Sequence, residues 1–270
     1  MLTPDQATEF LKSQKAWVKQ RDINCGENRD DELATCLKEQ TDLRTKSLSA
    51  KPNAGPGGAG TLIPFFQSEV GGKGKTKVDV LVYKFANPSD AAQKTFNAEI
   101  DMLIGDVPKP GAGDDPSASF DFSVDMSLDY ISAKLISART VTSSYLGGAH
   151  PNTQSATINI DVEKGAVAKF QDFLDETAAA KIVSICAKQV LQQKKDSLGS
   201  DVDFSEDTLR RLNDDIANAN KDLAQWTFKA GEAEIQYDQY VVGAYAEGAF
   251  SCEIPHAELR PLVKTGFPLP

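Results

Sequence analysis

Hydrophobic residues recur every three or four positions through the first fifty residues, and this spacing predicts two helices. The first segment places Phe10 and Trp17 on one face, and the second, residues 31–47, does the same with Leu33 and Leu37. A short stretch rich in Asn and Gly separates the two segments, which is typical of a turn. The N-terminal part is therefore expected to form a helical hairpin.

The pattern is interrupted at residues 49–61, which read SAKPNAGPGGAGT and contain almost no large apolar side chain. Gly, Pro and Ala in this proportion are typical of a linker. We therefore predict three parts: a hairpin at residues 1–48, a linker at 49–61 and a larger domain at 62–270.

Beyond Leu62 the period of the pattern changes to two, as β-strands require. Val78, Val80 and Val82 alternate with more polar positions, and residues 120–128 repeat the pattern. Further strands are expected within 131–145, 157–162, 226–228, 234–237 and 250–254, and helices over 92–103, 177–195, 203–218 and 257–263. Asp203 and Glu206 have the spacing of a capping box. Runs of strands interrupted by helices indicate an α+β fold with a largely antiparallel sheet and packed helices, preceded by the small helical hairpin.

Composition narrows the classes of partner. The chain has 270 residues, 40% of them hydrophobic, and 29 Lys+Arg against 39 Asp+Glu give a formal net charge of −10. This balance argues against binding nucleic acid or an anionic membrane surface, both of which select basic patches. It makes a cationic protein partner more plausible, but an ordinary acidic surface is the preferred explanation of the charge, because net charge concerns solubility and steering.

The compartment is indicated by the cysteines. Cys25 and Cys36 lie in the hairpin, Cys186 and Cys252 lie in the larger domain, and no pair has the C-x-x-C spacing of a metal or redox site. An even number of cysteines without metal spacing predicts two disulfides, one in each part, and an oxidising compartment; four buried free thiols are the alternative. The sequence contains no apolar run near the roughly 20 residues of a membrane-spanning helix. The N-terminus also lacks the features of a signal peptide, so the chain is expected to be either cytosolic or the mature part of an exported protein.

Motifs for catalysis are sparse. Residues 55–60 match G-x-G-x-x-G, but neither a preceding strand nor a following helix is predicted, so we interpret them as linker. His150 and His256 are the only histidines, too few for a zinc site or a readily assembled triad. His256 is expected at the surface or as a helix cap. Adjacent or near-adjacent acids could support glycosidase chemistry, but they are expected on solvated faces or in loops: Asp114/Asp115, Asp214/Asp215 and Glu232/Glu234. We expect no catalytic residue, cofactor or metal site.

Two loops are unusual in composition. Residues 145–152 read YLGGAHPN between two predicted strands, and residues 237–248 contain three tyrosines among small residues. Tyrosine offers a large amphipathic contact area at low entropic cost, which suits binding loops. Tyrosine hydroxyls that hold the loop against neighbouring strands are an equally reasonable interpretation.

These loops carry a family resemblance. The run Tyr145-x-Gly147-Gly148-Ala149-His150-Pro151-Asn152, followed by Gly165 and Phe170-x-Asp172-Phe173-Leu174, resembles the extracellular domain of the RsiV anti-sigma factor family. The run Tyr240-x-x-Gly243-Ala244-Tyr245-Ala246-x-Gly248, with Ile254-Pro255 to Leu259, is similar to that family's second signature, although the family often has Pro where this chain has Ala244. Residues 62–125 resemble the segment that precedes PdaC-type deacetylase domains, which leaves 126–270 as the RsiV-type region.

The hairpin resembles the later half of LprI-type lysozyme inhibitors. The matching positions are Trp17, Arg21, Asp22, Cys25, Cys36, Leu37, Thr41, Arg44 and Leu48. Both resemblances imply the cell envelope, a periplasmic or extracytoplasmic location, and a lysozyme-type partner.

The resemblances imply a non-enzymatic envelope protein that binds or inhibits a lysozyme-type cell-wall hydrolase or another cationic protein. The expected contact residues are Tyr145, Gly147, Gly148, His150, Tyr240, Tyr245 and Gly248. A peptidoglycan-binding or sensory module is the alternative, and a hydrolase is a third possibility.

Overall fold

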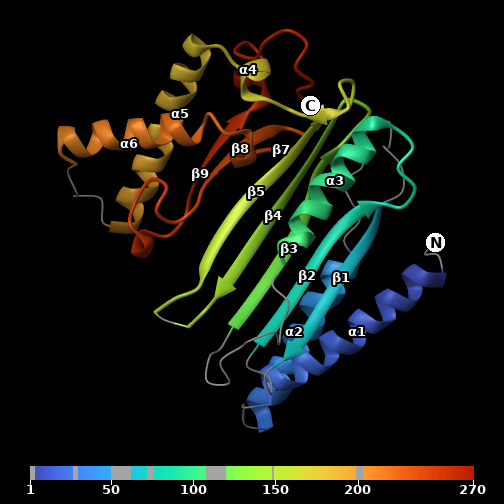
Figure 1. The fold of residues 1–270 in the computed structure, drawn as a ribbon. Coiled ribbons are helices and arrows are strands. Elements are labelled where there is room, and N and C mark those ends of the chain that lie inside the picture. Colours follow the sequence, from blue (N-terminus) through green and yellow to red (C-terminus); the bar gives the residue numbers. More distant parts are fainter. Residues whose placement is uncertain are drawn as a thin grey trace.

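A computed structural model describes residues 4–26, 30–49, 62–71, 76–107, 120–147, 149–198 and 204–270. It has the expected α+β fold: a six-stranded, mostly antiparallel sheet and a three-stranded antiparallel sheet, with helices packed on both (Figure 1). The predicted linker lies outside the described residues except for Ser49, which ends a helix. The division of the chain into domains therefore stays a prediction.

The N-terminal hairpin consists of α1 (Pro4–Cys25) and α2 (Asp30–Ser49), joined by the Cys25–Cys36 disulfide. Cys25 is fully buried, although so small a hairpin has little core of its own. The guanidinium of Arg44 lies 4.5 Å from the ring centre of Phe66 and 5.5 Å from that of Trp17. This cation–π arrangement attaches the hairpin to the large sheet.

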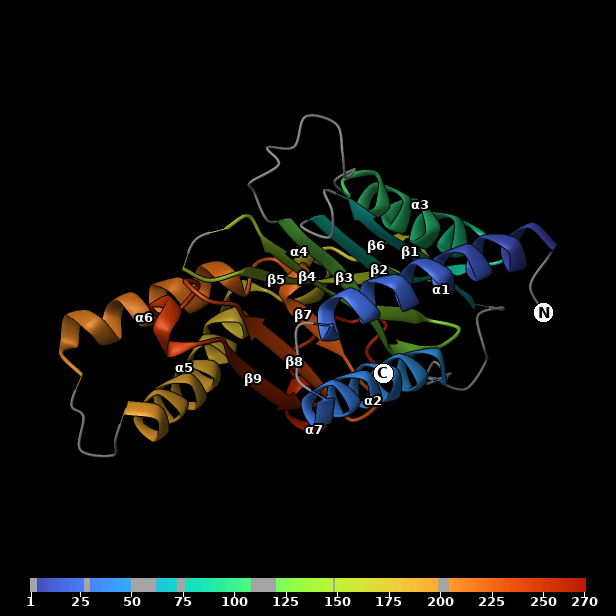
Figure 2. The same ribbon diagram turned by 90° about the horizontal axis from the view of Figure 1, so that it is seen from below.

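The large sheet follows chain order. Its strands are β1 (Leu62–Gly71), β2 (Thr76–Phe85), β3 (Phe120–Ile131), β4 (Leu135–Tyr145), β5 (Asn152–Asp161) and β6 (Ala166–Val167). Neighbours are antiparallel except β2 and β3, which are parallel because α3 (Ala91–Gly105) crosses over between them. Figure 2 shows α3 on one face of this sheet and the hairpin on the other.

The period-2 pattern decides what each face of the sheet buries. One face packs Val78, Val80 and Val124 with Phe96 and Ile100 of α3 in a core where all five are fully buried. On the other face of β2 and β3, polar side chains such as Asp79, Asp121 and Asp125 alternate with these residues. One face of the sheet is therefore a hydrophobic core, and the other carries charge.

The small sheet and the remaining helices form the C-terminal part. They are α4 (Phe170–Phe173), α5 (Glu176–Leu198), α6 (Glu206–Ala219), η2 (Leu223–Gln225), β7 (Trp226–Phe228), β8 (Glu232–Tyr237), η3 (Tyr245–Glu247), β9 (Phe250–Pro255) and α7 (His256–Leu259). A second core encloses Phe173, Trp226 and Phe228, whose rings meet edge to face or stacked.

Helix α5 closes the edge of the small sheet at β9. The Cys186–Cys252 disulfide joins the two elements, and both cysteines are fully buried. The side-chain amide of Gln193 pairs with both backbone groups of Ser251 at 2.7 and 3.2 Å, and that of Gln189 pairs with those of Glu253 at 2.8 and 3.0 Å. These amides form hydrogen bonds with backbone N–H and C=O groups at the edge of β9, which would otherwise be free to pair with a further strand.

Two local expectations are corrected. The N-cap of α6 is Ser205, whose Oγ accepts from Thr208 N at 3.2 Å, whereas Asp203 lies outside the described residues. The last helix covers only His256–Leu259, because Leu262 and Val263 turn back toward α4, where Val263 forms a bridge with Leu174. In the described part of the chain, no helix is long and apolar enough to cross a membrane.

Candidate functional site

The β4–β5 connection contains the first predicted loop. Tyr145 ends β4 half-buried, Gly147 has a φ of +85°, and His150 is exposed with its Nδ1 3.0 Å from Pro151 O. The positive φ explains glycine at position 147, because an L-residue is strained there. Gly148 lies outside the described residues.

The β8–β9 connection contains the second predicted loop. Tyr240 has a φ of +71° and an exposed fraction of 64%, and Gly248 has a φ of +83°. Glu247 closes the turn, because its Oε1 accepts from Ala244 N at 2.7 Å and its Oε2 lies 2.5 Å from Lys194 Nζ. A proline at position 244 would have no N–H for the first of these bonds.

The two loops are joined at one end of the molecule. The His150 ring stacks on the Tyr245 ring with a centroid distance of 3.5 Å, and Tyr245 Oη donates to Pro151 O at 3.1 Å. Tyr240 lies beside them, with its ring centre 5.7 Å from that of Tyr245. We call His150, Tyr240 and Tyr245 the joined-loop surface. Residues 95 positions apart in the sequence thus form one exposed aromatic face.

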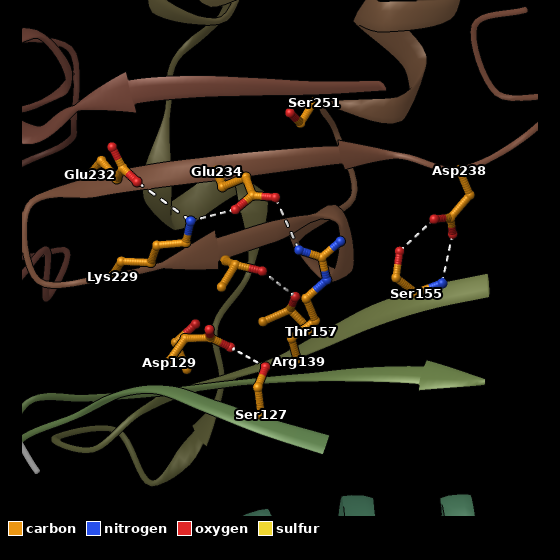
Figure 3. A network of polar contacts seen from close by, with 12 residues as sticks. Ser127, Asp129, Arg139, Ser155, Thr157, Lys229, Glu232, Glu234, Asp238 and Ser251 are labelled. Carbon is orange, nitrogen blue, oxygen red and sulfur yellow. Dashed lines mark hydrogen bonds and ion pairs between the residues drawn. The ribbon is translucent and has the colours of Figure 1, made fainter. Parts of the chain in front are cut away.

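A second set of contacts fixes the spacing of these loops. The Asp238 carboxylate, at the end of β8, accepts from Ser155 N at 2.6 Å and from Ser155 Oγ at 2.5 Å on β5 (Figure 3). Charge-assisted bonds of this length are strong and directional. These two hydrogen bonds therefore fix the position of the loop that follows Asp238 relative to the β4–β5 hairpin.

A cavity of about 550 Å³ lies beside Tyr145 and Pro151. It is lined by residues of β2, β3, β4 and the β4–β5 connection, most of which have a polar or charged side chain: Lys77, Asp79, Asp121, Phe122, Ser123, Ser143, Tyr145 and Pro151. Asp121 Oδ1 is buried and has no hydrogen-bond partner among the described residues. No sequence motif distinguishes these residues, although the alternation of acidic and apolar positions along β2 and β3 indicates a face of the sheet that carries charge.

A layer of charged side chains lies between the two sheets (Figure 3). Arg139 of β4 contacts Glu234 of β8 at 3.0 Å, and Lys229 contacts Glu234 at 2.5 Å and Glu232 at 3.4 Å. Burial alone would raise the pKa of Glu234, but the two cations outweigh it and lower the pKa. The expectation that Glu232 and Glu234 lie on a solvated face is wrong for Glu234, which faces the large sheet and pairs with Arg139.

Nearby, burial raises the pKa of Asp129 despite the hydrogen bond that Ser127 Oγ donates to it at 2.9 Å. Thr157 and Thr227 share a further hydrogen bond of 2.9 Å between β5 and β7. All these groups have partners from the protein itself, and the Arg139–Glu234 and Thr157–Thr227 contacts join the two sheets. The layer positions the joined loops and is not itself an open site.

The expectation for His256 is also wrong. Its exposed fraction is 6%, its backbone N donates to Gly231 O at 2.9 Å, and its Nε2 has no hydrogen-bond partner in the described structure. Burial, followed by the charge of Arg260, lowers the pKa of its imidazole despite Glu232. The ring is enclosed because α7 begins where β9 ends and turns back against the β7–β8 turn.

The cysteines lie away from the joined-loop surface and serve the fold. Within the described ranges, no cluster of three or more His, Cys, Asp or Glu residues is arranged to hold a metal ion. Of the predicted contact residues, the structure brings His150, Tyr240 and Tyr245 together. Tyr145 lies at the adjacent cavity, and Gly147 and Gly248 shape the turns.

Comparison with known proteins gives a family for part of the chain. Residues 171–257 match the family described as "Protein of unknown function (DUF3298)", a segment that includes Tyr240 and Tyr245. No curated protein matches. The resemblances to the RsiV, PdaC and LprI families stay predictions.

Two solved structures share the fold. One is a member of the DUF3298 family from Bacteroides fragilis, with a TM-score of 0.54 and 12% identity, covering 76% of this chain and 94% of that chain. The other is a DUF3298 family protein from Pseudomonas aeruginosa, with a TM-score of 0.50 and 18% identity, covering 78% and 96%. At these identities the likeness concerns the fold alone.

Proposed function

We propose that this chain is a non-enzymatic protein of the cell envelope that binds a basic, lysozyme-type cell-wall hydrolase through the joined-loop surface. The observation that carries the proposal is the stacking of His150 on Tyr245, which unites two loops of binding-type composition into one exposed face. Both disulfides fit an oxidising compartment.

The chemistry of the surface favours a cationic protein. Tyr240 presents a largely exposed ring on a tethered loop, and rigid aromatic anchors of this kind dominate binding energies. The neighbouring cavity contains Asp79 and the unpartnered Asp121 Oδ1, which suit a lysine or arginine side chain. The net charge of −10 steers a basic partner over longer distances.

The test is titration calorimetry with a basic animal lysozyme at low and at physiological ionic strength. We expect saturable binding at low salt that weakens as the Debye length falls to about 8 Å. Tyr240→Gly removes the ring while keeping a residue that tolerates the positive φ, so it should weaken binding about tenfold or more without loss of stability. Met102→Ala, on α3, removes a different exposed apolar side chain and should change nothing. Absence of heat at low salt contradicts the proposal.

A peptidoglycan-binding or sensory module is the alternative, because stacked aromatic rings can also pack against sugar faces. Co-sedimentation with purified sacculi distinguishes the two. Retention on sacculi that is lost in Tyr240→Gly, without affinity for lysozyme, would replace the hydrolase by the polymer as the ligand.

A further inference from the structure

A second cavity, of about 620 Å³, is lined mainly by residues of α4, α5 and α6. Its walls are mainly apolar and include Phe170, Ala179, Ile182, Ala217 and Trp226. Volume and lining fall within the range of small-molecule sites, which are concave and largely apolar with few polar groups.

One polar residue in this lining has an unmet hydrogen-bond requirement. Asn220 is 3% exposed, and its Oδ1 accepts from Tyr237 Oη at 2.7 Å while its backbone carbonyl accepts from Trp226 Nε1 at 2.9 Å. Its Nδ2 is buried and has no acceptor in the described structure. Buried amide donors are almost always paired, because an unpaired one costs free energy.

The charges at the mouth are balanced. Lys264 Nζ donates to Gln171 O at 2.7 Å, and Asp175 Oδ1, just before α5, accepts from Ala178 N in the first turn of that helix. Lys221 and Glu176 are exposed and also line the cavity. Lys221 and Lys264 balance Asp175 and Glu176, so the mouth of the cavity does not favour a ligand of either charge. The apolar walls and the Asn220 amide therefore determine which ligand binds.

We propose that this cavity binds a small, mainly apolar molecule with one carbonyl or carboxyl oxygen, and that this oxygen accepts a hydrogen bond from Asn220 Nδ2. A medium-length acyl chain, as a free acid or an ester, has this chemistry. The site is independent of the joined-loop surface, so either proposal can fail without the other.

The test uses Trp226 as a reporter in the full chain. Trp17→Phe removes the only other tryptophan, and the protein is then titrated with decanoate, methyl decanoate and decylammonium below their micelle concentrations. We expect saturable changes in Trp226 fluorescence with the two acceptor-carrying probes. Decylammonium, which has only donors, should bind at least tenfold more weakly.

Two variants locate the site. Ala179→Phe combined with Ala217→Phe places two rings in the cavity from α5 and α6 and should weaken binding at least tenfold. The matched control, Ser184→Phe with Asn218→Phe, adds the same rings at exposed positions of the same helices and should bind normally. Asn220→Asp keeps an acceptor for Tyr237 but lacks the donor, so a folded variant should bind both acceptor probes about tenfold more weakly.

The proposal is overturned if no probe gives saturable binding. It is also overturned if the double phenylalanine variant binds like its control, or if decylammonium binds as tightly as decanoate. Should Asn220→Asp fail to fold by circular dichroism, the cavity-filling pair and the probe series still decide the question.

Discussion

Tyr240 keeps its backbone at a φ of +71°, in the left-handed region that costs a residue with a Cβ about 1 kcal/mol or more. Its ring is mostly exposed, so burial of the side chain does not offset this cost. The strain is maintained by a turn in which Val241 N donates to Asp238 O at 3.1 Å, directly after the Asp238–Ser155 contact. Because the exposed ring adds little to the stability of the fold, we infer that the strained backbone of Tyr240 serves to present the ring to a binding partner.

His256 gives a residue-scale prediction for pH. Because its pKa in the folded protein is lowered, mainly by burial, the unfolded chain binds more protons as pH falls through 6.5. The stability contributed by the neutral ring is therefore complete above pH 6.5 and is lost on acidification. Between pH 7.5 and 5.5 we expect the free energy of unfolding to fall, with a slope from this group of at most about 1.4 kcal/mol per pH unit.

Urea unfolding at a series of pH values checks this expectation. His256→Gln should flatten the slope in this range, whereas His150→Gln, which removes the exposed histidine of the joined-loop surface, should keep it. Equal slopes in the wild type and His256→Gln would show that His256 does not carry the dependence.

At the scale of elements, α5 connects the core to the joined loops. Lys194 is almost completely buried, contacts Glu247 at 2.5 Å and lies 4.6 Å from the ring centre of Phe250. A Cβ at Gly243 would come within 2.6 Å of Lys194 Nζ, so glycine there allows the ion pair to form under the loop. Lys194 thus acts on the joined-loop surface through Glu247 and not by contact with a partner.

Lys194→Met keeps the aliphatic stem but leaves Glu247 without its cation. We expect a loss of about 1–3 kcal/mol in the free energy of unfolding, because Glu247 stays partly shielded from water. Binding of a basic lysozyme should also weaken, even though the variant is more acidic and would be steered more strongly. Lys188→Met, at an exposed position of α5, makes the same charge change and should not weaken binding.

A double-mutant cycle with Glu247→Gln separates the ion pair from the packing of the lysine stem. A coupling energy near zero would mean that the contact does not hold the loop.

The elements themselves could largely be predicted from periodicity, since Val78, Val80 and Val82 alternate and Phe96 and Ile100 share a helical face. The contacts that position the site could not. Arg139 and Glu234 lie 95 residues apart, and nothing local distinguishes Glu234 from an acid on a solvated face. Likewise, glutamines 189 and 193 have the composition of an exposed helix, and only the docked edge of β9 gives their amides a role. Family resemblance alone indicated that both loops belong to the contact surface, and the direct contact of His150 with Tyr245 was not predicted.

At the scale of the whole molecule, two different parts of the chain cover the charged face of the large sheet. The hairpin covers β1 and its neighbours through Arg44, whereas the small sheet covers β4 and β5 through Arg139 and the threonine pair. The polar cavity with Asp79 and Asp121 lies on the strands between these coverings. The position of the hairpin therefore affects one wall of the region proposed to receive a cationic side chain.

Arg44 tests whether the hairpin and the C-terminal core unfold as one unit. Its exposed fraction is 7%, burial lowers its pKa, and Asp79 and Asp125 partly offset that burial. Arg44→Ala removes both the ring contacts and a cation near two carboxylates, so we expect the hairpin to lose about 2–4 kcal/mol of its docking free energy. The C-terminal core contains no contact of Arg44 and should keep its stability.

Trp17 reports on the hairpin and Trp226 on the C-terminal core, so single-tryptophan variants made with Trp226→Phe and Trp17→Phe separate the two transitions. In the Arg44→Ala background, the urea midpoint of Trp17 fluorescence should fall while that of Trp226 stays the same. Arg21→Ala is the matched control, because Arg21 also lies 5.5 Å from the Trp17 ring, while its guanidinium donates hydrogen bonds within the hairpin, to Asp22 and Thr41. If both midpoints fall together in Arg44→Ala, the hairpin is part of one cooperative unit and the predicted boundary at residues 49–61 is not a boundary in folding.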